Sequence, residues 1–397
     1  MAKKILLQCQ ALTYLYTGLG AIYTKYQDCK EELEIDVLFT RNTETENYIK
    51  KIKLSKYIKN VYYISDEKLE NIVSKIRKLK NNYEGNILFK KFYYPKAYNV
   101  LRSVLPNFDY SDIFFSHEIP TYLITFLKKV SPQTNFVIYG DGSGLLMGKG
   151  TKLINPYRKP GKIVFLPEIK PDEIIALAPI IEDDSFDPIE IPVSATCPEI
   201  LLKLIQNDTK IQESINTYTN SLLDKYSNYP HKTLLLTTRL EDKRFCMNKD
   251  DQINIYLDMI EKYCPENSLI ILKLHPSTNT NIAKILSEKC TKNCAFEIMP
   301  DELKEYPIEI YSKLIQNIGL AITFLSSSRI SLSQLYKIKT TDAYEIVQKY
   351  PLRYRINPML KVFQKVLDNY PTWDKKSIIY QCDIIPDLKN FYENYAK

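Results

Sequence analysis

Short runs of apolar, β-branched and aromatic residues alternate along the chain with longer stretches whose apolar positions recur at helical spacing. The runs predict strands at KILLQC (4–9), LEIDVLF (33–39), VYYI (61–64), DIFF (112–115), NFVIY (135–139), KIVFL (162–166), TLLLTT (233–238), SLIILKL (268–274), AFEIM (295–299) and LAITF (320–324). The stretches between them predict helices, for example over 66–80, 198–206, 210–227, 250–263, 279–290 and 307–317. This alternation predicts an α/β fold, with parallel sheets covered by helices on both faces.

The chain has 397 residues, which is long enough for two domains. A boundary is predicted near SNYPHK (227–232), because a long helical stretch ends there and a new strand–helix series begins. We therefore expect an N-terminal domain over 1–229, a second domain over 230–345 and a helical tail over 346–397, in which prolines mark the breaks.

The cysteines and the start of the chain indicate a reducing compartment. The eight Cys residues are scattered without paired metal-ligand spacing, so we expect free thiols. The first apolar run resembles a signal peptide, but Gln8 and Gln10 interrupt it and no cleavage pattern follows, so a first strand is the better interpretation. No stretch approaches the ~18 uninterrupted apolar residues of a membrane span. A cytoplasmic protein is expected.

The net charge of +7 leaves two interpretations of the surface. Basic and aromatic residues interleave over 78–102, 155–162 and 349–355. One interpretation is that these stretches form an ordinary solvated Lys-rich surface. The other is that they attract anionic glycans or an anionic membrane face, and in the latter case the protein would associate peripherally with the inner membrane. No recognised nucleic-acid-binding motif accompanies the charge, so no nucleic-acid partner is expected.

Three polar clusters follow predicted strands. VIY runs into GDGSG (140–144), LIILKL into His275-Pro276-Ser277, and LAITFL into Ser326-Ser327-Ser328. In open α/β sheets the ligand crevice lies beyond the carboxyl ends of the strands. We therefore expect the three clusters to face one site between the two halves of the chain.

The first cluster is rich in glycine, since five of the ten Gly residues of the chain fall between positions 140 and 150. It does not match a phosphate loop, because Lys149 is followed by Gly150, and its glycine spacing does not match the dinucleotide pattern. What remains is Asp141 at a strand end in a loop that can bend sharply. An ionised Asp suits a general base toward a hydroxyl, while an ordinary Asp-Gly turn is the alternative.

For His275 and for the serine cluster, the sequence allows either a role in binding a phosphate or a purely structural role. The imidazole can donate to phosphate oxygens, or it can simply be bonded to the backbone. The three serines precede a predicted helix, where one Ser serves as N-cap and several with the helix amides can form an anion site. The chain has no GxSxG, HExxH or paired CxxC pattern, so a serine hydrolase and a zinc enzyme are not expected.

Taken in order, these motifs resemble the bacterial sialyltransferases with the GT-B fold, a group that includes lipooligosaccharide sialyltransferases and capsular polysialyltransferases. Met299-Pro300 and the PIEI segment that contains Glu309 resemble the family segment that binds the ribose of the cytidine nucleotide, and Glu309 lies 17 residues before Ser326. The resemblance implies two Rossmann-like domains whose parallel sheets face a central cleft. One departure is Gly140, which stands where the family usually has a first acidic residue.

The resemblance also implies an inverting, metal-independent transfer of sialic acid from CMP-sialic acid to a hydroxyl of a cell-surface glycan, either lipooligosaccharide or capsule. Asp141 would be the catalytic base, and His275 would act on the leaving phosphate. The donor-binding residues would be Lys273, Pro276, Met299, Pro300, Glu309, Ser326, Ser327 and Ser328, and the loop around the base would consist of Gly140, Gly142, Ser143 and Gly144. No cofactor is implied besides the donor substrate.

Two alternatives stay open. One is a GT-B transferase with another donor, which could be CMP-Kdo, another nonulosonic acid or a UDP-hexose. A diphosphate donor favours several cations near the second and third clusters, and Arg329 is the one we find. The other alternative is a glycan- or nucleotide-binding protein without catalytic activity.

Overall fold

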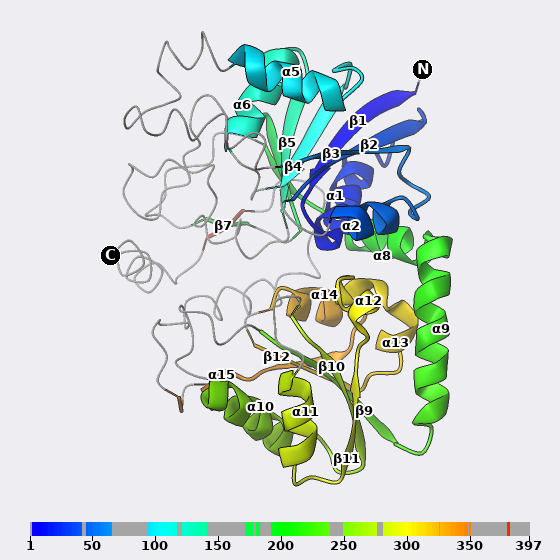
Figure 1. Ribbon diagram of the computed structural model, residues 1–397, viewed down its shortest axis with the longest axis vertical. Coiled ribbons are helices and arrows are strands. Elements are labelled where there is room, and N and C mark those ends of the chain that lie inside the picture. The colour runs from blue at the N-terminus through cyan, green and yellow to red at the C-terminus, as the bar shows by residue number, and fades with distance from the viewer. Residues whose placement is uncertain are drawn as a thin grey trace. The chain divides into compact units, whose positions relative to one another are not determined.

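The computed structural model describes residues 2–41, 45–65, 94–116, 121–140, 171–177, 180–182, 192–238, 249–275, 281–324, 326–347, 349–350 and 379–381. The chain forms two compact units (Figure 1). The first comprises residues 1–204 and 373–397, and the second comprises residues 205–372. This division falls within the last turn of the helix Pro198–Asn207, just before the long helix Thr209–Lys225, whereas the boundary predicted at 229 and 230 falls after that long helix.

The first unit is built on a seven-stranded parallel sheet of order β3-β2-β1-β4-β5-β6-β8. Its strands are β1 (Lys3–Cys9), β2 (Leu33–Thr40), β3 (Asn60–Ile64), β4 (Asp112–Ser116), β5 (Asn135–Gly140), β6 (Glu173–Ala176) and β8 (Val193–Ala195). Its helices include α1 (Leu12–Lys25), α2 (Thr45–Ile52), α5 (Tyr94–Val104), α6 (Thr121–Val130) and α8 (Pro198–Asn207). A separate pair joins β7 (Ile180–Glu182) to β14 (Ile379–Gln381). The predicted strand over 162–166 and the predicted helix over 66–80 lie outside the described residues.

The two faces of the first sheet bury different side chains of the same strands. Leu6 and Phe115 belong to a core cluster with residues of α5 and α6. Leu7 points to the opposite face, where α1 packs so closely that a Cβ added to Gly18 would lie 2.4 Å from Leu7 Cδ1 and 3.1 Å from Tyr139 Cζ. Strands buried on both faces explain why the sequence shows continuous apolar runs here.

The second unit contains a five-stranded parallel sheet of order β11-β10-β9-β12-β13. Its strands are β9 (His231–Leu236), β10 (Ser268–Lys273), β11 (Cys294–Ile298), β12 (Leu320–Thr323) and β13 (Lys339–Asp342). Its helices include α9 (Thr209–Lys225), α10 (Lys249–Tyr263), α11 (Asn281–Lys289), α12 (Asp301–Lys304), the 3-10 helix η2 (Ile308–Ile310), α13 (Ser312–Ile315), α14 (Ser328–Leu335) and α15 (Tyr344–Val347). The helix predicted over 307–317 is therefore a 3-10 turn followed by a short α-helix.

In chain order within each unit, the five strands of the second sheet and the first five strands of the first sheet share the order 3-2-1-4-5, and the first sheet continues with β6 and β8. This is the order of the Rossmann fold. The predicted α/β class with two Rossmann-like domains is confirmed. In such a sheet the first and fourth strands are neighbours whose connections leave in opposite directions, and ligands bind beyond their carboxyl ends. In the second unit these two strands are β9 and β12.

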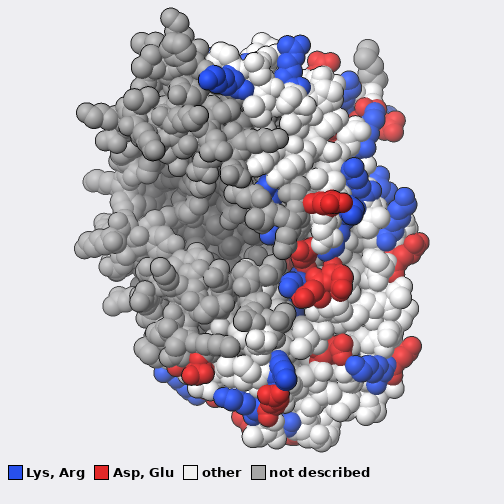
Figure 2. All heavy atoms as spheres, viewed as in Figure 1, with Lys and Arg blue, Asp and Glu red and all other residues white. Residues whose placement is uncertain are grey.

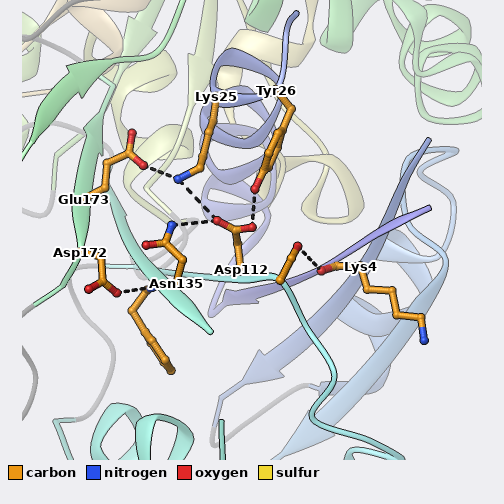
Figure 3. A network of polar contacts seen from close by, with 9 residues as sticks. Lys4, Lys25, Tyr26, Asp112, Asn135, Asp172 and Glu173 are labelled. Atoms are coloured by element: carbon orange, nitrogen blue, oxygen red, sulfur yellow. Dashed lines mark hydrogen bonds and ion pairs between the residues drawn. The ribbon is translucent and has the colours of Figure 1, made fainter. Parts of the chain in front are cut away.

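A partly buried polar network around Asp112 lies at the amino edge of the first sheet (Figure 3). Lys25 and Tyr26, at the end of α1, point toward the Asp112 carboxylate at the start of β4, with Lys25 Nζ 3.4 Å from Oδ1 and Tyr26 donating its hydroxyl to Oδ2. Asn135 Nδ2 donates to Asp112 Oδ1 at 2.8 Å, and Lys25 also pairs with Glu173. Burial acts to raise the pKa of Asp112, but the hydrogen bonds from Asn135 and Tyr26 and the charge of Lys25 outweigh it and lower the pKa.

No helix among the described residues is long and apolar enough to cross a membrane.

Candidate functional site

The candidate site of the second unit begins with the level at which its strands end. Leu235 of β9 pairs with Leu272 of β10 on one side and with Ile322 of β12 on the other. The three strands therefore run in register to the same edge of the sheet. His275, two residues beyond β10, and the serines that begin three residues beyond β12 both follow this edge. The structure thus brings the second and third polar clusters to the ends of the two strands that flank β9.

Thr237 and Thr238 connect these strand ends, and the sequence analysis did not single them out. Thr237 Oγ1 accepts a hydrogen bond from the backbone N of His275 at 2.9 Å, which fixes the start of that loop. Thr238 Oγ1 donates to the carbonyl of Phe324, directly after β12, at 2.5 Å. Tyr256 of α10 donates its hydroxyl to the Thr238 carbonyl at 2.6 Å and accepts from the Thr238 backbone N at 2.9 Å. The segment after β9 is therefore held to both neighbours at the switch point of the sheet.

The three serines form the start of α14. Ser327 is the N-cap residue, yet its side chain makes no capping hydrogen bond. Ser326 Oγ instead accepts from the backbone N of Ser328 at 3.3 Å. All three serines are half-buried, and the helix they open contributes its first amides and the positive end of its dipole. Hydroxyls and amides at one helix start can together hold an anion.

His275 itself is exposed. Its backbone is fixed by Thr237, so the imidazole extends from a defined point at the edge of the sheet. Pro276, which was expected to assist donor binding, lies outside the described residues.

The backbone of the Glu309 segment is held by hydrogen bonds from two helices. Glu309 belongs to η2, and its carbonyl accepts a hydrogen bond from the Tyr336 hydroxyl at the end of α14. The next carbonyl, of Ile310, accepts from Gln212 Nε2 of α9 at 2.8 Å. The backbone at Glu309 is therefore fixed by two different helices, while its side chain stays partly exposed.

Met299 and Pro300 connect β11 to this segment. The Met299 side chain is buried, and its backbone N donates to the carbonyl of Leu272 at 3.0 Å. The Pro300 carbonyl accepts hydrogen bonds from the backbone N of Leu303 and from that of Lys304, and these two bonds form the first turn of α12. These contacts give both residues a positioning role at the same edge. Their expected contact with a donor stays a prediction.

Lys273, the last residue of β10, is 9% exposed. Its Nζ donates to the carbonyl of Lys304 at 2.7 Å. Burial lowers its pKa to about 8, and the charge of Glu309 acts in the opposite direction.

In the first unit, β5 ends at Gly140, which is buried and whose carbonyl accepts from the backbone N of Leu177 at 3.0 Å. The predicted base Asp141 follows directly, and it lies outside the described residues, as do Gly142, Ser143 and Gly144. Their expected roles stay predictions. Because Gly140 is fixed in the sheet, the start of this loop is at the carboxyl edge, as the sequence predicts for it.

A second buried network lies at that carboxyl edge, around Gln8 of β1. Gln8 Nε2 donates to Thr40 Oγ1 at 2.9 Å, and its Oε1 accepts from the backbone N of Ser116 at 3.0 Å. The Tyr139 hydroxyl donates to the Gln8 carbonyl at 2.5 Å. The ends of β1, β2, β4 and β5 are thus bonded together. The sequence signal was available, because a Gln within an apolar strand needs buried polar partners.

The carboxyl edge of the second sheet also carries an ion pair. Arg329 of α14 lies 4.0 Å from Asp342 at the end of β13, measured from Nη1 to Oδ2. Among the described residues, no group of three or more His, Cys, Asp and Glu side chains is placed to hold a metal ion.

The described surface mixes both signs of charge. On the face drawn in Figure 2, Lys and Arg side chains are interspersed with Asp and Glu side chains. Most of the three basic and aromatic stretches expected to attract anions lies outside the described residues. The interpretation of an anion-attracting surface thus rests on the sequence.

No protein-family model matches the chain, and no curated protein is detectably similar to it in sequence. Several solved structures resemble it distantly. The E. coli heptosyltransferase WaaC with ADP-2-deoxy-2-fluoro heptose is 9% identical with a TM-score of 0.38, over 85% of this chain and 87% of that chain. A glycosyl transferase family 9 structure from Veillonella parvula is 6% identical, with a TM-score of 0.42, over 85% and 80%. The UDP-GlcNAc 2-epimerase from Neisseria meningitidis bound to UDP-GlcNAc is 12% identical, with a TM-score of 0.45, over 99% and 94%.

These three proteins are not sialyltransferases, and identities and TM-scores this low carry no information on substrate. The resemblance to sialyltransferases therefore rests on the sequence motifs alone.

Proposed function

We propose that the chain is a glycosyltransferase that moves a sialic acid from CMP-sialic acid to a hydroxyl of a glycan. The observation that supports this most is the carboxyl edge of the second sheet. There Thr237 and Thr238 bond the His275 loop to the end of β12, just before the serines, at the switch point where Rossmann-like sheets bind ligands. This edge provides an imidazole, hydroxyls and helix amides, which are the groups that a phosphate leaving group requires.

In the proposed reaction, the acceptor oxygen attacks the anomeric carbon of the sialic acid, and the bond from that carbon to the phosphate oxygen breaks. The proton of the acceptor hydroxyl goes to the Asp141 carboxylate, and the electron pair of the broken bond leaves with CMP. His275, Ser326 and Ser327 stabilise the charge that develops on the phosphate, and the dipole of α14 adds to their effect. Glu309 accepts hydrogen bonds from the ribose hydroxyls.

The proposal includes a GT-B arrangement, in which the acceptor binds to the first unit and the nucleotide to the second. It also includes a cytoplasmic enzyme that acts on lipooligosaccharide or capsule and associates with the inner membrane through basic stretches. CMP has a single phosphate, so the leaving group carries less charge than a nucleoside diphosphate. We therefore expect EDTA to leave the activity unchanged.

The test is to incubate the protein with CMP-sialic acid, with and without lactose, and to measure CMP release. Acceptor-dependent release supports the proposal. Binding of CMP without release, over a range of glycan acceptors, would instead favour a binding protein. Release from CMP-Kdo or a UDP-hexose, but not from CMP-sialic acid, would keep the reaction class and overturn the donor.

A further inference from the structure

Tyr336 connects two parts of the candidate site in the second unit. It directly follows α14, whose start is formed by the three serines. The Tyr336 hydroxyl donates to the carbonyl of Glu309 in η2. Because that hydroxyl carries one proton, the Ser312 hydroxyl, whose oxygen lies 2.9 Å away, donates to the Tyr336 oxygen in turn. One side chain therefore bonds the end of α14 to η2 and to the start of α13.

The residues on either side of Glu309 determine where its carboxylate points. Ile308 and Ile310 belong to the core and are 2% and 0% exposed, whereas Glu309 between them is partly exposed. Successive side chains of a 3-10 helix point about 120° apart, so a side chain between two buried neighbours turns away from the core. The position of the Glu309 carboxylate is thus set by where η2 lies.

Hydrogen bonds tie this segment to α9, α12 and α14. Gln212 of α9 donates to the Ile310 carbonyl at 2.8 Å, and the Tyr311 hydroxyl donates to the Leu303 carbonyl in α12. The bond from Tyr336 joins the segment to the end of α14, which also packs against η2. Because α14 carries the serines at its start, this bond fixes the distance between the serines and η2.

A nucleotide has a fixed distance between its phosphate and its ribose hydroxyls. In the proposed site the serines bind the phosphate and Glu309 binds the ribose, so both contacts form together only while α14 and η2 keep their relative position. A site that holds this position before the ligand arrives does not lose affinity to the cost of ordering it on binding.

We propose that Tyr336 is a positioning residue, whose hydroxyl holds the Glu309 carboxylate at the distance from the serines that the ribose of a bound nucleotide requires. It acts through the backbone of η2 and does not touch the nucleotide, since its hydroxyl is already bonded to the Glu309 carbonyl and to Ser312. This inference rests on the proposed function for its ligand class, because it assumes that a nucleotide binds at this edge.

The experiment compares two ligands that differ only in the ribose hydroxyls. Calorimetric titration of the full chain with CMP and with 2′,3′-dideoxy-CMP gives a ratio of affinities, and the wild type should prefer CMP by about 10-fold or more. In Tyr336→Phe this preference should fall about 5-fold, which corresponds to one hydrogen bond. The affinity for the dideoxy analogue, which keeps the phosphate, should stay within about 2-fold of the wild type.

Two results of this titration would overturn the proposal. Equal weakening of both ligands in Tyr336→Phe would show that the hydroxyl only supports the fold. An unchanged preference would show that η2 stays in position without it. If Tyr336→Phe does not fold, Ser312→Ala takes its place, because it removes the bond that orients the Tyr336 hydroxyl. Its preference for CMP should fall about 2-fold, and a full preference in this variant would contradict the positioning role.

Two matched controls remove a tyrosine hydroxyl elsewhere. Tyr311→Phe loses a bond within the same segment, but to the Leu303 carbonyl, so it should retain the full preference. Tyr63→Phe loses a bond to the Arg41 carbonyl, at 2.7 Å in the first unit, and should retain it as well. A loss in Tyr311→Phe as large as that in Tyr336→Phe would mean that general loosening of the segment causes the effect, and would overturn the proposal.

Failure of this inference and failure of the proposed function give different results. UDP and ADP with their dideoxy analogues are titrated in parallel. If the wild type binds one of these and not CMP, the sialic acid donor is wrong and the ribose comparison proceeds with the nucleotide that binds. If CMP binds and the wild type shows no ribose preference, or Tyr336→Phe keeps it in full, the positioning role alone is wrong. Binding of none of the three nucleotides would overturn both.

Discussion

The amino edge of the first sheet and the carboxyl edge of the second sheet are both rich in polar groups, but they use them differently. At the amino edge, Asp112 is surrounded by Lys25, Tyr26 and Asn135, and the polar atoms of this network bond to one another. At the carboxyl edge, Thr237 and Thr238 bond to the backbone of adjacent strands, while His275 and the serines extend toward the surface. The internally bonded network around Asp112 therefore holds the end of α1 to the first sheet, and the imidazole and hydroxyls that reach the surface mark the candidate site.

The largest effect expected from this comparison is on stability. Asp112→Ala removes the acceptor for three side chains and leaves Lys25 with Glu173 as its ion-pair partner, so the free energy of unfolding should fall by about 3 kcal/mol. Urea unfolding measures this change. CMP release per folded molecule should stay at the wild-type value. The exposed Asp109→Ala is the control, with a change within about 0.5 kcal/mol. A large loss of turnover in folded Asp112→Ala would contradict the interpretation that the amino edge of the first sheet has only a structural role.

The next effect is on turnover. If the proposed function is right, His275→Ala should lower the rate of CMP release from CMP-sialic acid by about 100-fold or more, because it removes the proposed hydrogen-bond donor to the leaving phosphate. The imidazole is exposed, so the urea midpoint should not move. His231→Ala, at the exposed amino end of β9, is the matched control and should retain full turnover. Turnover near the wild-type value in His275→Ala would contradict the assigned role.

A smaller effect should appear in both measurements at once. Thr238→Val keeps the shape of the side chain but removes the hydroxyl that donates to the Phe324 carbonyl. We expect a loss of about 1 kcal/mol in the free energy of unfolding and a fall of several-fold in turnover, since the link from β9 to β12 is weakened. Thr217→Val, on an exposed turn of α9, should change neither quantity measurably. Unchanged values in both variants would show that the link is dispensable.

The smallest effect concerns pH. The pKa of Asp112 is lower in the folded protein than in the unfolded chain, so its contribution to stability is complete above the unfolded pKa of about 4 and is lost as the pH falls through the folded value. The stability difference between wild type and Asp112→Asn should therefore shrink below about pH 4. Urea midpoints from pH 7 to pH 3 provide the measurement. A difference that widens on acidification would mean that Asp112 binds its proton more easily in the fold.

The parts of the fold that could be predicted are those with continuous apolar runs. The cores of β10 and β12 are buried on both faces, so their sequences identify them without ambiguity. The strand β13 has the sequence KTTD and no apolar signal, because pairing with β12 rather than burial makes it a strand. The sequence was also silent on the two threonines at the end of TLLLTT, which leave the ladder after Leu236 and bond to both neighbouring strands.

Each polar cluster of the second unit follows directly after a predicted strand. The sequence therefore predicted which strand ends carry the polar clusters, because parallel strands end at a common edge. It did not predict Gln8, since a single polar residue in an apolar run first looks like an interruption and not like the centre of a network. The sequence also did not predict that Lys273 is buried. Alternation along a strand shows which side chains share a face of the sheet, but not what covers that face. The role of Asp141 stays a prediction.

The pairing of β7 with β14 gives the two units different chain topology. Residues 379–381 return to pair with residues 180–182, so the first unit is assembled from two segments of the chain and the second is one uninterrupted insertion between them. During synthesis, the insertion emerges complete before β14, the strand with which the later segment pairs back to its host. A circular permutation that joins the original termini would make the host continuous. The second unit could then be exchanged as one continuous segment for a related unit, which would test directly whether it determines the donor of the proposed reaction.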